Sequence, residues 1–411
     1  MLGYALFLFV LAYIVSLKRI VKRPMLYYQS NSVAESIAKS IPSFHKHFLP
    51  FFIYSKGYIE SKVYQLRTKK HRDFQRMVLI SKENEEILLD IYEIQEEPEK
   101  SVKQKKFGIF DKILTNFYFY DKILENKPVK KPKEKFTNSI KYDETFSTKN
   151  EILEKRPFSK IENILLVHGF NGSSSVSYIN NLAFRLKGHR IFAVNARGSI
   201  SELKSEKFFH IGYTDDLESV IEFILNNFEG NLVLIGFSMG ASWVTNYLSK
   251  NVNDRISLGI GVCVPFDFYA LNCKHQTSCV SLLMALEFKG YLRKHKTFKK
   301  YDYENLITVE EIDSVITTKV FNFQSVDEYY HTQSCKGKLS KIKTPMIFIN
   351  TKDDPLIPYD TIPFDEIKEN GLLILCLLET GGHLGMMDIF FNNSFLELSI
   401  NDILKIFDKH K

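Results

Sequence analysis

Apolar residues in the C-terminal part of the chain form short runs that alternate with stretches of helical periodicity. The runs at 164–167, 190–194 and 231–235 are typical of strands buried on both faces of a sheet. Between the second and third runs, the apolar residues of 216–228 recur on one helical face, and Thr214 precedes them as a candidate N-terminal cap. This alternation predicts an α/β fold with a mostly parallel sheet and helices on both faces.

A hairpin precedes this alternating region, and one long insertion interrupts it. Residues 76–80 and 87–92 are predicted strands, and the charged residues 82–86 form the turn between them. Residues 265–340 mix aromatic, polar and helical segments between two predicted strands, so we expect a lid there and call this part the lid region. The remaining predicted elements are helices at 178–186 and 241–250 and strands at 256–264, 345–350 and 371–378.

The first 17 residues contain no charged side chain, and Lys18, Arg19, Lys22 and Arg23 follow them. As a helix, 17 residues would span roughly 25 Å, slightly less than a hydrocarbon core. A cleaved signal peptide is the alternative, but it would place basic residues before the apolar run and a small-residue cleavage site after it. We therefore expect residues 1–17 to be a retained transmembrane anchor. The positive flank favours a cytosolic main body, at the endoplasmic reticulum or another endomembrane.

Charge is distributed unevenly along the 411 residues, whose net charge is +7. Residues 18–73 hold twelve basic and three acidic side chains, so the rest of the chain is slightly acidic. This confines the basic excess to a juxtamembrane segment, residues 18–74, and argues against a nucleic-acid-binding role for the main domain. Residues 93–160 are rich in Lys and Glu without periodicity, and we expect an exposed insertion there.

Composition narrows the class of protein further. With 45% hydrophobic and 25% charged residues, the chain is globular rather than fully disordered or collagen-like. Its five cysteines are irregularly spaced and odd in number, which favours free thiols over a disulfide framework.

A candidate nucleophile lies between a predicted strand and a predicted helix. Residues 236–240 read Gly-Phe-Ser-Met-Gly, with the strand 231–235 before them and the helix 241–250 after them. Such a strand–turn–helix holds a serine, here Ser238, on a strained turn above the sheet. The amide of Met239 would then face a developing oxyanion. The alternative is an ordinary serine in a glycine-rich turn.

A serine nucleophile needs a base that an acid orients, and the acid candidates follow the predicted strand 345–350. Asp353 and Asp354 compete for this role. The common pattern places a proline four residues after the acid and a small residue three before it. Pro358 and Thr351 fit Asp354, which we therefore favour over Asp353.

The base candidate is His383, which lies in a glycine-flanked loop beyond the predicted strand 371–378. The order Ser238, Asp354, His383 is the one expected for α/β-hydrolases. The other histidines lack such a setting, and three of them are expected at the surface: His275, His295 and His331.

A second oxyanion donor is expected in the His-Gly turn after the strand 164–167. The amide of Phe170 is our candidate, while His168 shapes the loop rather than taking part in the chemistry. The run 172–175 could be read as a phosphate loop, but it lacks the lysine and the spacing of one.

Several motifs together resemble a known family. They are His168-Gly-Phe-Asn-Gly-Ser, Ser177-Tyr-Ile179, Asn195-Ala-Arg-Gly198, Gly236-Phe-Ser-Met-Gly240, Val264-Pro-Phe-Asp267, Tyr329-Tyr330 with Ser334, Asn350 through Pro355, and Gly382-His-Leu-Gly385. The sequence resembles the membrane-anchored α/β-hydrolase-domain proteins, which include monoacylglycerol lipases, phospholipases and medium-chain ester synthases/esterases. The resemblance covers roughly residues 75–395 apart from the insertion 93–160. It implies an α/β-hydrolase domain, which we place at residues 75–411 with the lid region at 265–340. It also implies Ser238 as nucleophile, His383 as base and an aspartate of 353–354 as the third member.

The chain departs from that family at the charged hairpin turn 82–86, the insertion 93–160 and residues 314–323 of the lid region. We expect a serine hydrolase of lipid carboxylic esters that acts at a membrane without a metal or organic cofactor. The alternatives are an acyltransferase that makes medium-chain esters with the same triad, and a catalytically silent membrane scaffold. Residues 383–388 also fit an H-x4-D acyltransferase pattern, which we treat as coincidental because its histidine is the triad base.

Overall fold

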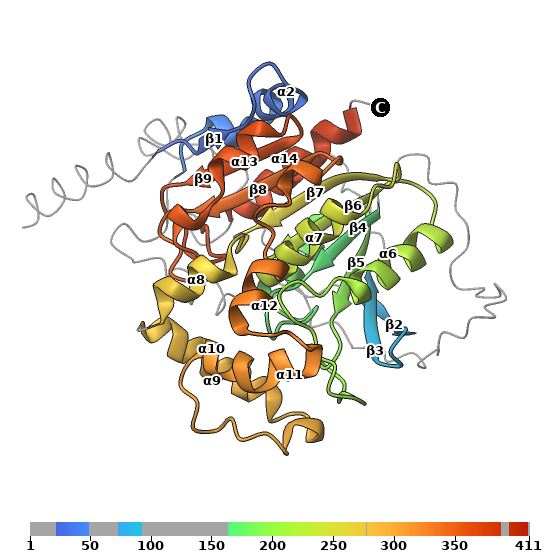
Figure 1. The fold of residues 1–411 in the computed structure, drawn as a ribbon. Coiled ribbons are helices and arrows are strands. Elements are labelled where there is room, and N and C mark those ends of the chain that lie inside the picture. Colours follow the sequence, from blue (N-terminus) through green and yellow to red (C-terminus); the bar gives the residue numbers. More distant parts are fainter. Residues whose placement is uncertain (1–21, 49–72, 93–162, 277, 388–393, 410–411) are drawn as a thin grey trace, which may run out of the picture.

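Nine strands form a single sheet in the computed structural model, which describes residues 22–48, 73–92, 163–276, 278–387 and 394–409 (Figure 1). The strands are β1 (Met25–Tyr27), β2 (Phe74–Ile80), β3 (Glu86–Tyr92), β4 (Asn163–Val167), β5 (Arg190–Asn195), β6 (Leu232–Phe237), β7 (Ile256–Val262), β8 (Met346–Thr351) and β9 (Leu373–Leu378). Their order across the sheet is β1-β9-β8-β7-β6-β4-β5-β3-β2.

The centre of the sheet is parallel and its two edges are antiparallel. Strands β5, β4, β6, β7, β8 and β9 run parallel to their neighbours. The β2–β3 hairpin joins β5 antiparallel at one edge, and β1 joins β9 antiparallel at the other. The predicted mostly parallel sheet and the predicted hairpin are therefore confirmed, whereas β1 was not predicted.

Helices cover both faces of the sheet, because each central strand presents apolar side chains on both sides. In β4, Leu165 and Val167 belong to one buried cluster, and Ile164 and Leu166 belong to the other. The first cluster includes residues of α6 (Asp215–Asn227), α7 (Met239–Lys250) and α13 (Phe364–Glu369). The second includes residues of α2 (Val33–Ser40), α5 (Ser177–Arg185) and α14 (Phe395–Lys409).

The N-terminus of α6 lacks the side-chain cap that the sequence predicts at Thr214. Thr214 occupies the N-cap position, but its backbone is helical and its side chain makes no capping hydrogen bond. Its hydroxyl instead accepts a hydrogen bond from Nζ of Lys250 at 3.3 Å. Capping by this side chain requires an extended backbone at the cap residue, and the helical backbone at Thr214 removes that geometry.

The lid region lies between β7 and β8 and consists of short helices. They gather beyond one end of the sheet in Figure 1. The elements are α8 (Phe268–His275), α9 (Cys279–Leu292), η3 (Lys296–Phe298), α10 (Val309–Ile312), the π-helical turn η4 (Asp313–Thr317), α11 (Thr318–Phe321), α12 (Val326–Gln333) and η5 (Leu339–Lys341).

Three predicted segments fall wholly or largely outside the described residues: the anchor at 1–17, the insertion at 93–160 and much of the basic segment at 18–74. Among the residues that the structure does describe, no helix is both long and apolar enough to cross a membrane.

Candidate active site

Ser238 lies on a strained turn at the junction of β6 and α7. Its backbone angles are φ 52° and ψ −121°, a combination that costs energy for any residue with a side chain. Gly236 and Gly240 make the turn possible. A Cβ at position 236 would lie 2.4 Å from the carbonyl oxygen of Gly240, and one at position 240 would lie 2.3 Å from that of His168. The turn therefore requires glycine at both positions.

The structure brings Ser238, His383 and Asp354 into one hydrogen-bonded chain. Nε2 of His383 lies 2.9 Å from Oγ of Ser238, and Nδ1 of His383 lies 2.8 Å from Oδ2 of Asp354. The three residues follow β6, β9 and β8 respectively, and these strands are parallel. Their carboxyl ends therefore meet at one edge of the sheet. In such an arrangement the imidazole can accept the serine proton while the carboxylate fixes the ring and its tautomer.

The two adjacent aspartates have different partners. Oδ1 of Asp354 accepts the amides of Leu356 at 2.8 Å and Ile357 at 3.1 Å, which leaves Oδ2 for the imidazole. Oδ1 of Asp353 accepts the amide of Gly382 at 2.9 Å, so this carboxyl holds the loop before His383. Burial raises the pKa of Asp353 to about 6.

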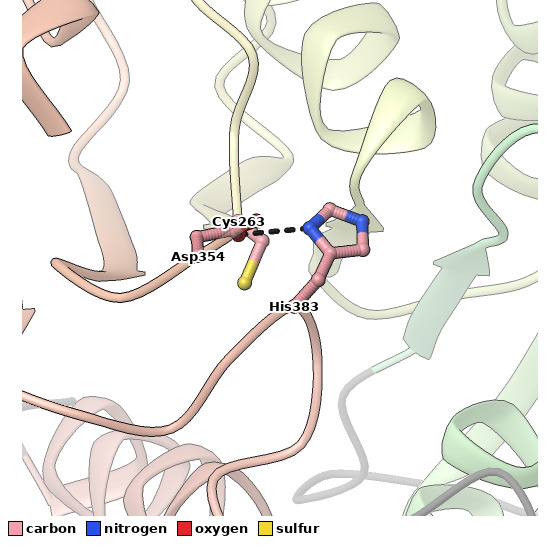
Figure 2. Close-up of side chains that lie close together, drawn as sticks. All are labelled: Cys263, Asp354 and His383. Carbon is pink, nitrogen blue, oxygen red and sulfur yellow. Dashed lines mark hydrogen bonds and ion pairs between the residues drawn. The ribbon is translucent and has the colours of Figure 1, made fainter. Parts of the chain in front are cut away.

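Cys263 lies beside Asp354 and His383 (Figure 2). Its sulfur accepts the amide of Leu384 at 3.4 Å, and burial raises the pKa of the thiol well above its usual value. One donor atom from each of Cys263, Asp354 and His383 lies within 4.8 Å of the other two. A metal there would need the thiolate and the same imidazole that contacts Ser238, so the donor set does not suit a resident metal.

Phe170 and Met239, the two residues proposed to supply oxyanion donors, line one cavity together with Ser238 and His383. Within the described part of the chain, neither amide N–H donates a hydrogen bond to another group. Two free amides beside a serine hydroxyl can bind the negative charge that develops on a carbonyl oxygen during its attack.

The turn that carries Phe170 is held by buried side chains. The hydroxyl of Tyr178 accepts the amide of Gly169 at 3.0 Å. His168 is fully buried, and its Nδ1–H donates to the carbonyl of Gly169 at 2.6 Å while Nε2 accepts the amide of Ala196 at 3.1 Å. Burial lowers the pKa of His168 to about 4, so this ring is neutral near pH 7. His168 thus shapes the loop, as predicted. The contribution of Tyr178 was not predicted.

The cavity in front of Ser238 has a volume of about 180 Å³ and mostly apolar walls. Five phenylalanines contribute to it, and residues of the lid region form part of its wall. The phenylalanines are Phe170, Phe208, Phe209, Phe268 and Phe288. Such a cavity fits an aliphatic chain better than a polar group.

Comparisons with known proteins bear on the fold. Residues 162–276 match the model of the α/β hydrolase fold family. The chain has the α/β-hydrolase fold. It is 28% identical over 250 residues to a monoacylglycerol lipase of Saccharomyces cerevisiae, which covers 54% of each protein. It is 27% identical over 242 residues to phospholipase ABHD3 of Homo sapiens, which covers 55% of this chain and 58% of that protein.

The chain spans little more than half the length of these two relatives. Among solved structures, the Pyrococcus furiosus esterase Pf2001 aligns with a TM-score of 0.47 at 11% identity, over 83% of this chain and 98% of that one.

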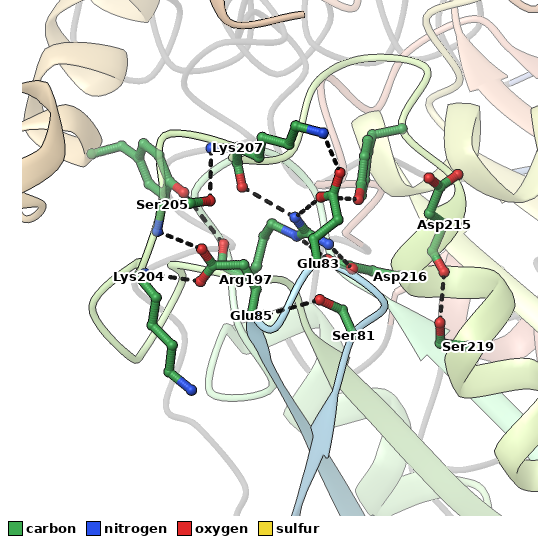
Figure 3. Close-up of polar contacts among 12 residues, drawn as sticks. Ser81, Glu83, Glu85, Arg197, Lys204, Ser205, Lys207, Asp215, Asp216 and Ser219 are labelled. Atoms are coloured by element: carbon green, nitrogen blue, oxygen red, sulfur yellow. Dashed lines mark hydrogen bonds and ion pairs between the residues drawn. The ribbon is translucent and has the colours of Figure 1, made fainter. Parts of the chain in front are cut away.

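The charged turn of the β2–β3 hairpin, residues 82–86, belongs to a network of ion pairs and hydrogen bonds (Figure 3). Arg197 is only 1% exposed and donates to both carboxylate oxygens of Asp216, while Nη1 donates to Glu83 at 2.6 Å. Glu85 accepts the amides of Lys204 at 3.0 Å and Ser205 at 2.6 Å. The acidic turn therefore holds the residues that follow β5, a contact that the sequence analysis did not predict.

One expectation about histidines was wrong. His295 is buried rather than at the surface, because the rings of Tyr291 and Phe298 pack against it and its Nδ1 accepts the amide of Leu203 at 3.3 Å. His331 is exposed, as expected, and His275 is half-buried at the edge of the cavity.

Proposed function

We propose that the chain is a serine hydrolase of lipid carboxylic esters, with Ser238 as nucleophile, His383 as general base and Asp354 as the residue that orients it. The hydrogen-bonded chain from Ser238 through His383 to Asp354, at the floor of an apolar cavity, carries this proposal. No metal or organic cofactor is needed, because the side chains supply both the nucleophile and the proton transfer.

Acylation begins when Oγ of Ser238 attacks the ester carbonyl and Nε2 of His383 takes the hydroxyl proton. The carbonyl oxygen becomes an oxyanion, which the amides of Phe170 and Met239 stabilise. Asp354 stabilises the imidazolium through Nδ1–H. The tetrahedral intermediate then collapses, the carbon–oxygen bond to the alcohol breaks, and His383 returns its proton to the departing alcohol.

Deacylation repeats the same steps with water. His383 takes a proton from water, the hydroxide attacks the acyl carbonyl, and the carboxylic acid leaves as Ser238 regains its proton. An alcohol in place of water would yield a new ester. Hydrolysis and acyl transfer therefore share every residue of the site, and the acceptor decides the product.

Lipid esters suit this site better than small polar esters because the walls of the cavity are mostly aromatic and aliphatic. Relatives named as a monoacylglycerol lipase and a phospholipase support the same class of substrate. The predicted anchor at residues 1–17 and the predicted cytosolic orientation of the main body would place the cavity beside a membrane.

Labelling with a fluorophosphonate probe tests the nucleophile. The wild type and Ser219→Ala, a variant of a serine on α6 that does not line the cavity, should both become labelled, and Ser238→Ala should not. A panel of acylglycerol and phospholipid esters, with and without an added alcohol acceptor, then identifies the substrate and the product. Absence of labelling in the wild type, or equal labelling of Ser238→Ala, would contradict the proposal.

A further inference from the structure

One wall of the cavity in front of Ser238 carries a buried carboxyl. Asp313 lines the cavity from the π-helical turn η4, between α10 and α11, and is 4% exposed. Single π-helical turns within helices are rare and are frequent at functional sites. The carboxyl accepts the hydroxyls of Thr317 and Tyr330 and forms no ion pair with a described residue. A carboxylate offers about four acceptor positions, so Asp313 retains capacity for another donor.

His210, in the loop between β5 and α6, adds an unpaired donor to the same cavity. It is 8% exposed, and burial lowers the pKa of its ring to about 3, so the ring is neutral near pH 7. Nδ1 accepts the amide of Gly212 at 3.2 Å, which places the proton on Nε2. No polar group of the described residues accepts a hydrogen bond from this Nε2–H, and the nitrogen keeps some exposed surface. The aromatic rings packed against it are only weak acceptors.

Tyr329, which also lines the cavity, contacts the surroundings of both groups. Its ring centroid lies 5.6 Å from that of His210 and 5.2 Å from that of Tyr330, whose hydroxyl donates to Asp313. The backbone of His210 is fixed as well, because its carbonyl accepts Nε1–H of Trp243 at 2.8 Å. The donor and the acceptor therefore belong to one section of the wall, the part around Tyr329.

A purely aliphatic ligand would suit neither group. Covering a polar group without pairing it costs free energy, because the group loses its hydrogen bonds to water. A hydroxyl is both a donor and an acceptor, so its O–H can donate to Asp313 while its oxygen accepts from Nε2–H of His210. A quaternary ammonium group would balance the charge of Asp313 but would leave the donor of His210 unpaired. The pair of groups therefore fits a hydroxyl better than a cation.

We propose that His210 and Asp313 form a hydroxyl-binding subsite, which selects ester substrates that carry a free hydroxyl group. The proposal rests on the proposed function for the ester chemistry and adds two specificity-determining residues to it. The hydroxyl belongs either to the alcohol part of the ester, as in a partial ester of a polyol, or to the acyl chain. The aliphatic remainder of the substrate occupies the part of the cavity that the phenylalanines line.

Turnover of three matched esters tests the subsite and distinguishes the two sources of the hydroxyl. Decanoylglycerol carries hydroxyls on the alcohol part, propyl ω-hydroxydecanoate carries one on the acyl chain, and propyl decanoate carries none. The kcat/KM of each hydroxylated ester is divided by that of propyl decanoate, so that a general loss of folding or of chemistry cancels. The assay is run above pH 7, where Asp313 is ionised because its pKa is about 6.

Two variants remove one half of the subsite each. Asp313→Asn replaces a charged acceptor by a neutral one, and His210→Asn keeps an acceptor for the amide of Gly212 but removes the Nε2–H. Each variant should lower the ratio of one hydroxylated ester by at least about fivefold, the difference that one such hydrogen bond makes. The ester whose ratio falls identifies the source of the hydroxyl. An unchanged ratio for both hydroxylated esters in either variant would overturn the subsite.

Tyr330→Phe is the matched control for a purely structural role of Asp313. It removes a contact between the carboxyl and the lid region but keeps the carboxyl itself. Its ratios should not fall, even where the variant is less stable than the wild type. An equal fall in Tyr330→Phe and Asp313→Asn would show that Asp313 acts by holding the lid region rather than by binding a hydroxyl.

Calorimetric binding of octanol tests the subsite without turnover. Octanol can donate a hydrogen bond, whereas its methyl ether cannot. Asp313→Asn should weaken the binding of octanol at least about fivefold more than that of the ether. Equal effects on the two ligands, or no binding of octanol to the wild type, would contradict the subsite. If the wild type hydrolyses none of the three esters, the proposed function fails while the calorimetry still decides the subsite.

Discussion

Nδ1 of His383 lies 2.8 Å from Oδ2 of Asp354. The other oxygen of that carboxylate is held by the amides of Leu356 and Ile357, so the acid reaches the ring with its own position fixed by backbone. Asp353, one residue earlier, points its Oδ1 to the amide of Gly382 instead. Two neighbouring aspartates therefore support the same histidine in different ways, one through the ring and one through the loop.

This difference predicts unequal effects of isosteric substitution. Asp354→Asn should lower kcat on a soluble ester by about 10³–10⁴-fold, because an amide neither stabilises the imidazolium nor fixes the correct tautomer. Asp353→Asn keeps an oxygen that can accept the amide of Gly382 and should lower kcat less than about tenfold. Thermal unfolding of both variants checks that each is folded. A larger loss for Asp353→Asn would reverse the assignment of the two residues.

The two glycines at positions 240 and 290 should respond in opposite directions to alanine. A Cβ at Gly240 would lie 2.3 Å from the carbonyl oxygen of His168 and 2.5 Å from that of Val167, so Gly240→Ala must displace the loop that carries Phe170. A Cβ at Gly290, in α9, meets nothing within 4 Å. Gly290→Ala should therefore stabilise the protein by about 0.5–1 kcal/mol through helix propensity.

Chemical denaturation and ester turnover measure both glycine variants. Gly240→Ala should lose at least about 1–3 kcal/mol of unfolding free energy and most of its turnover, because the overlap involves backbone rather than a movable side chain. Normal turnover in Gly240→Ala would show that the loop of Phe170 tolerates a shift and would weaken the oxyanion assignment.

The central sheet was predictable because burial on both faces leaves a simple pattern. A strand such as β4, Asn163–Val167, has no solvent-facing side and appears in the sequence as an uninterrupted apolar run. The order of Ser238, Asp354 and His383 was also visible, since each follows a strand whose position the pattern gives. That these side chains meet follows from the parallel strands, which bring their carboxyl ends to one edge.

Features that depend on tertiary contacts were not predictable in the same way. Strand β1 has three residues and exists because it pairs with β9, and three residues are too few to show a period. His295 is buried by rings that approach it in space, and a polar residue in an irregular segment gives no sign of this. Nothing in the sequence around Cys263 distinguishes it from an ordinary cysteine after a strand, and only the fold places it beside Asp354 and His383.

The network around Arg197 predicts that removing a buried cation costs much more unfolding free energy than removing an exposed one. Arg197→Met would leave the carboxylate of Asp216 buried without its cation, and should cost about 3–5 kcal/mol of unfolding free energy. Lys207 also pairs with Glu83, but its side chain is 52% exposed, so Lys207→Ala should cost no more than about 1 kcal/mol. Urea denaturation of both variants measures these costs. Similar values for the two variants would contradict the view that Arg197 organises this network.

Asp313 in the lid region predicts a stability change that depends on pH. This carboxyl is 4% exposed, accepts the hydroxyl of Tyr330 at 2.8 Å and that of Thr317, and forms no ion pair with a described residue. Burial raises its pKa from 3.8 to about 6. An acid whose pKa is raised by folding contributes to stability while it is protonated in both the folded and the unfolded state. This contribution is lost as the pH rises through about 6, because the carboxyl of the unfolded chain ionises at lower pH than that of the folded protein and so stabilises the unfolded state.

Asp313→Asn removes this dependence. The unfolding free energy of the variant minus that of the wild type should increase between about pH 4 and pH 6 by up to about 3 kcal/mol and stay level above that range, because a shift of about two pKa units is worth that much. Asp353 and other titrating groups contribute equally to both proteins and cancel in the difference. Asp254→Asn, at an exposed turn, is the matched control and should give no such increase. A flat difference for Asp313→Asn would mean that water or a cation reaches this carboxyl in the folded protein, and the lid region would then be more open at Asp313 than its burial indicates.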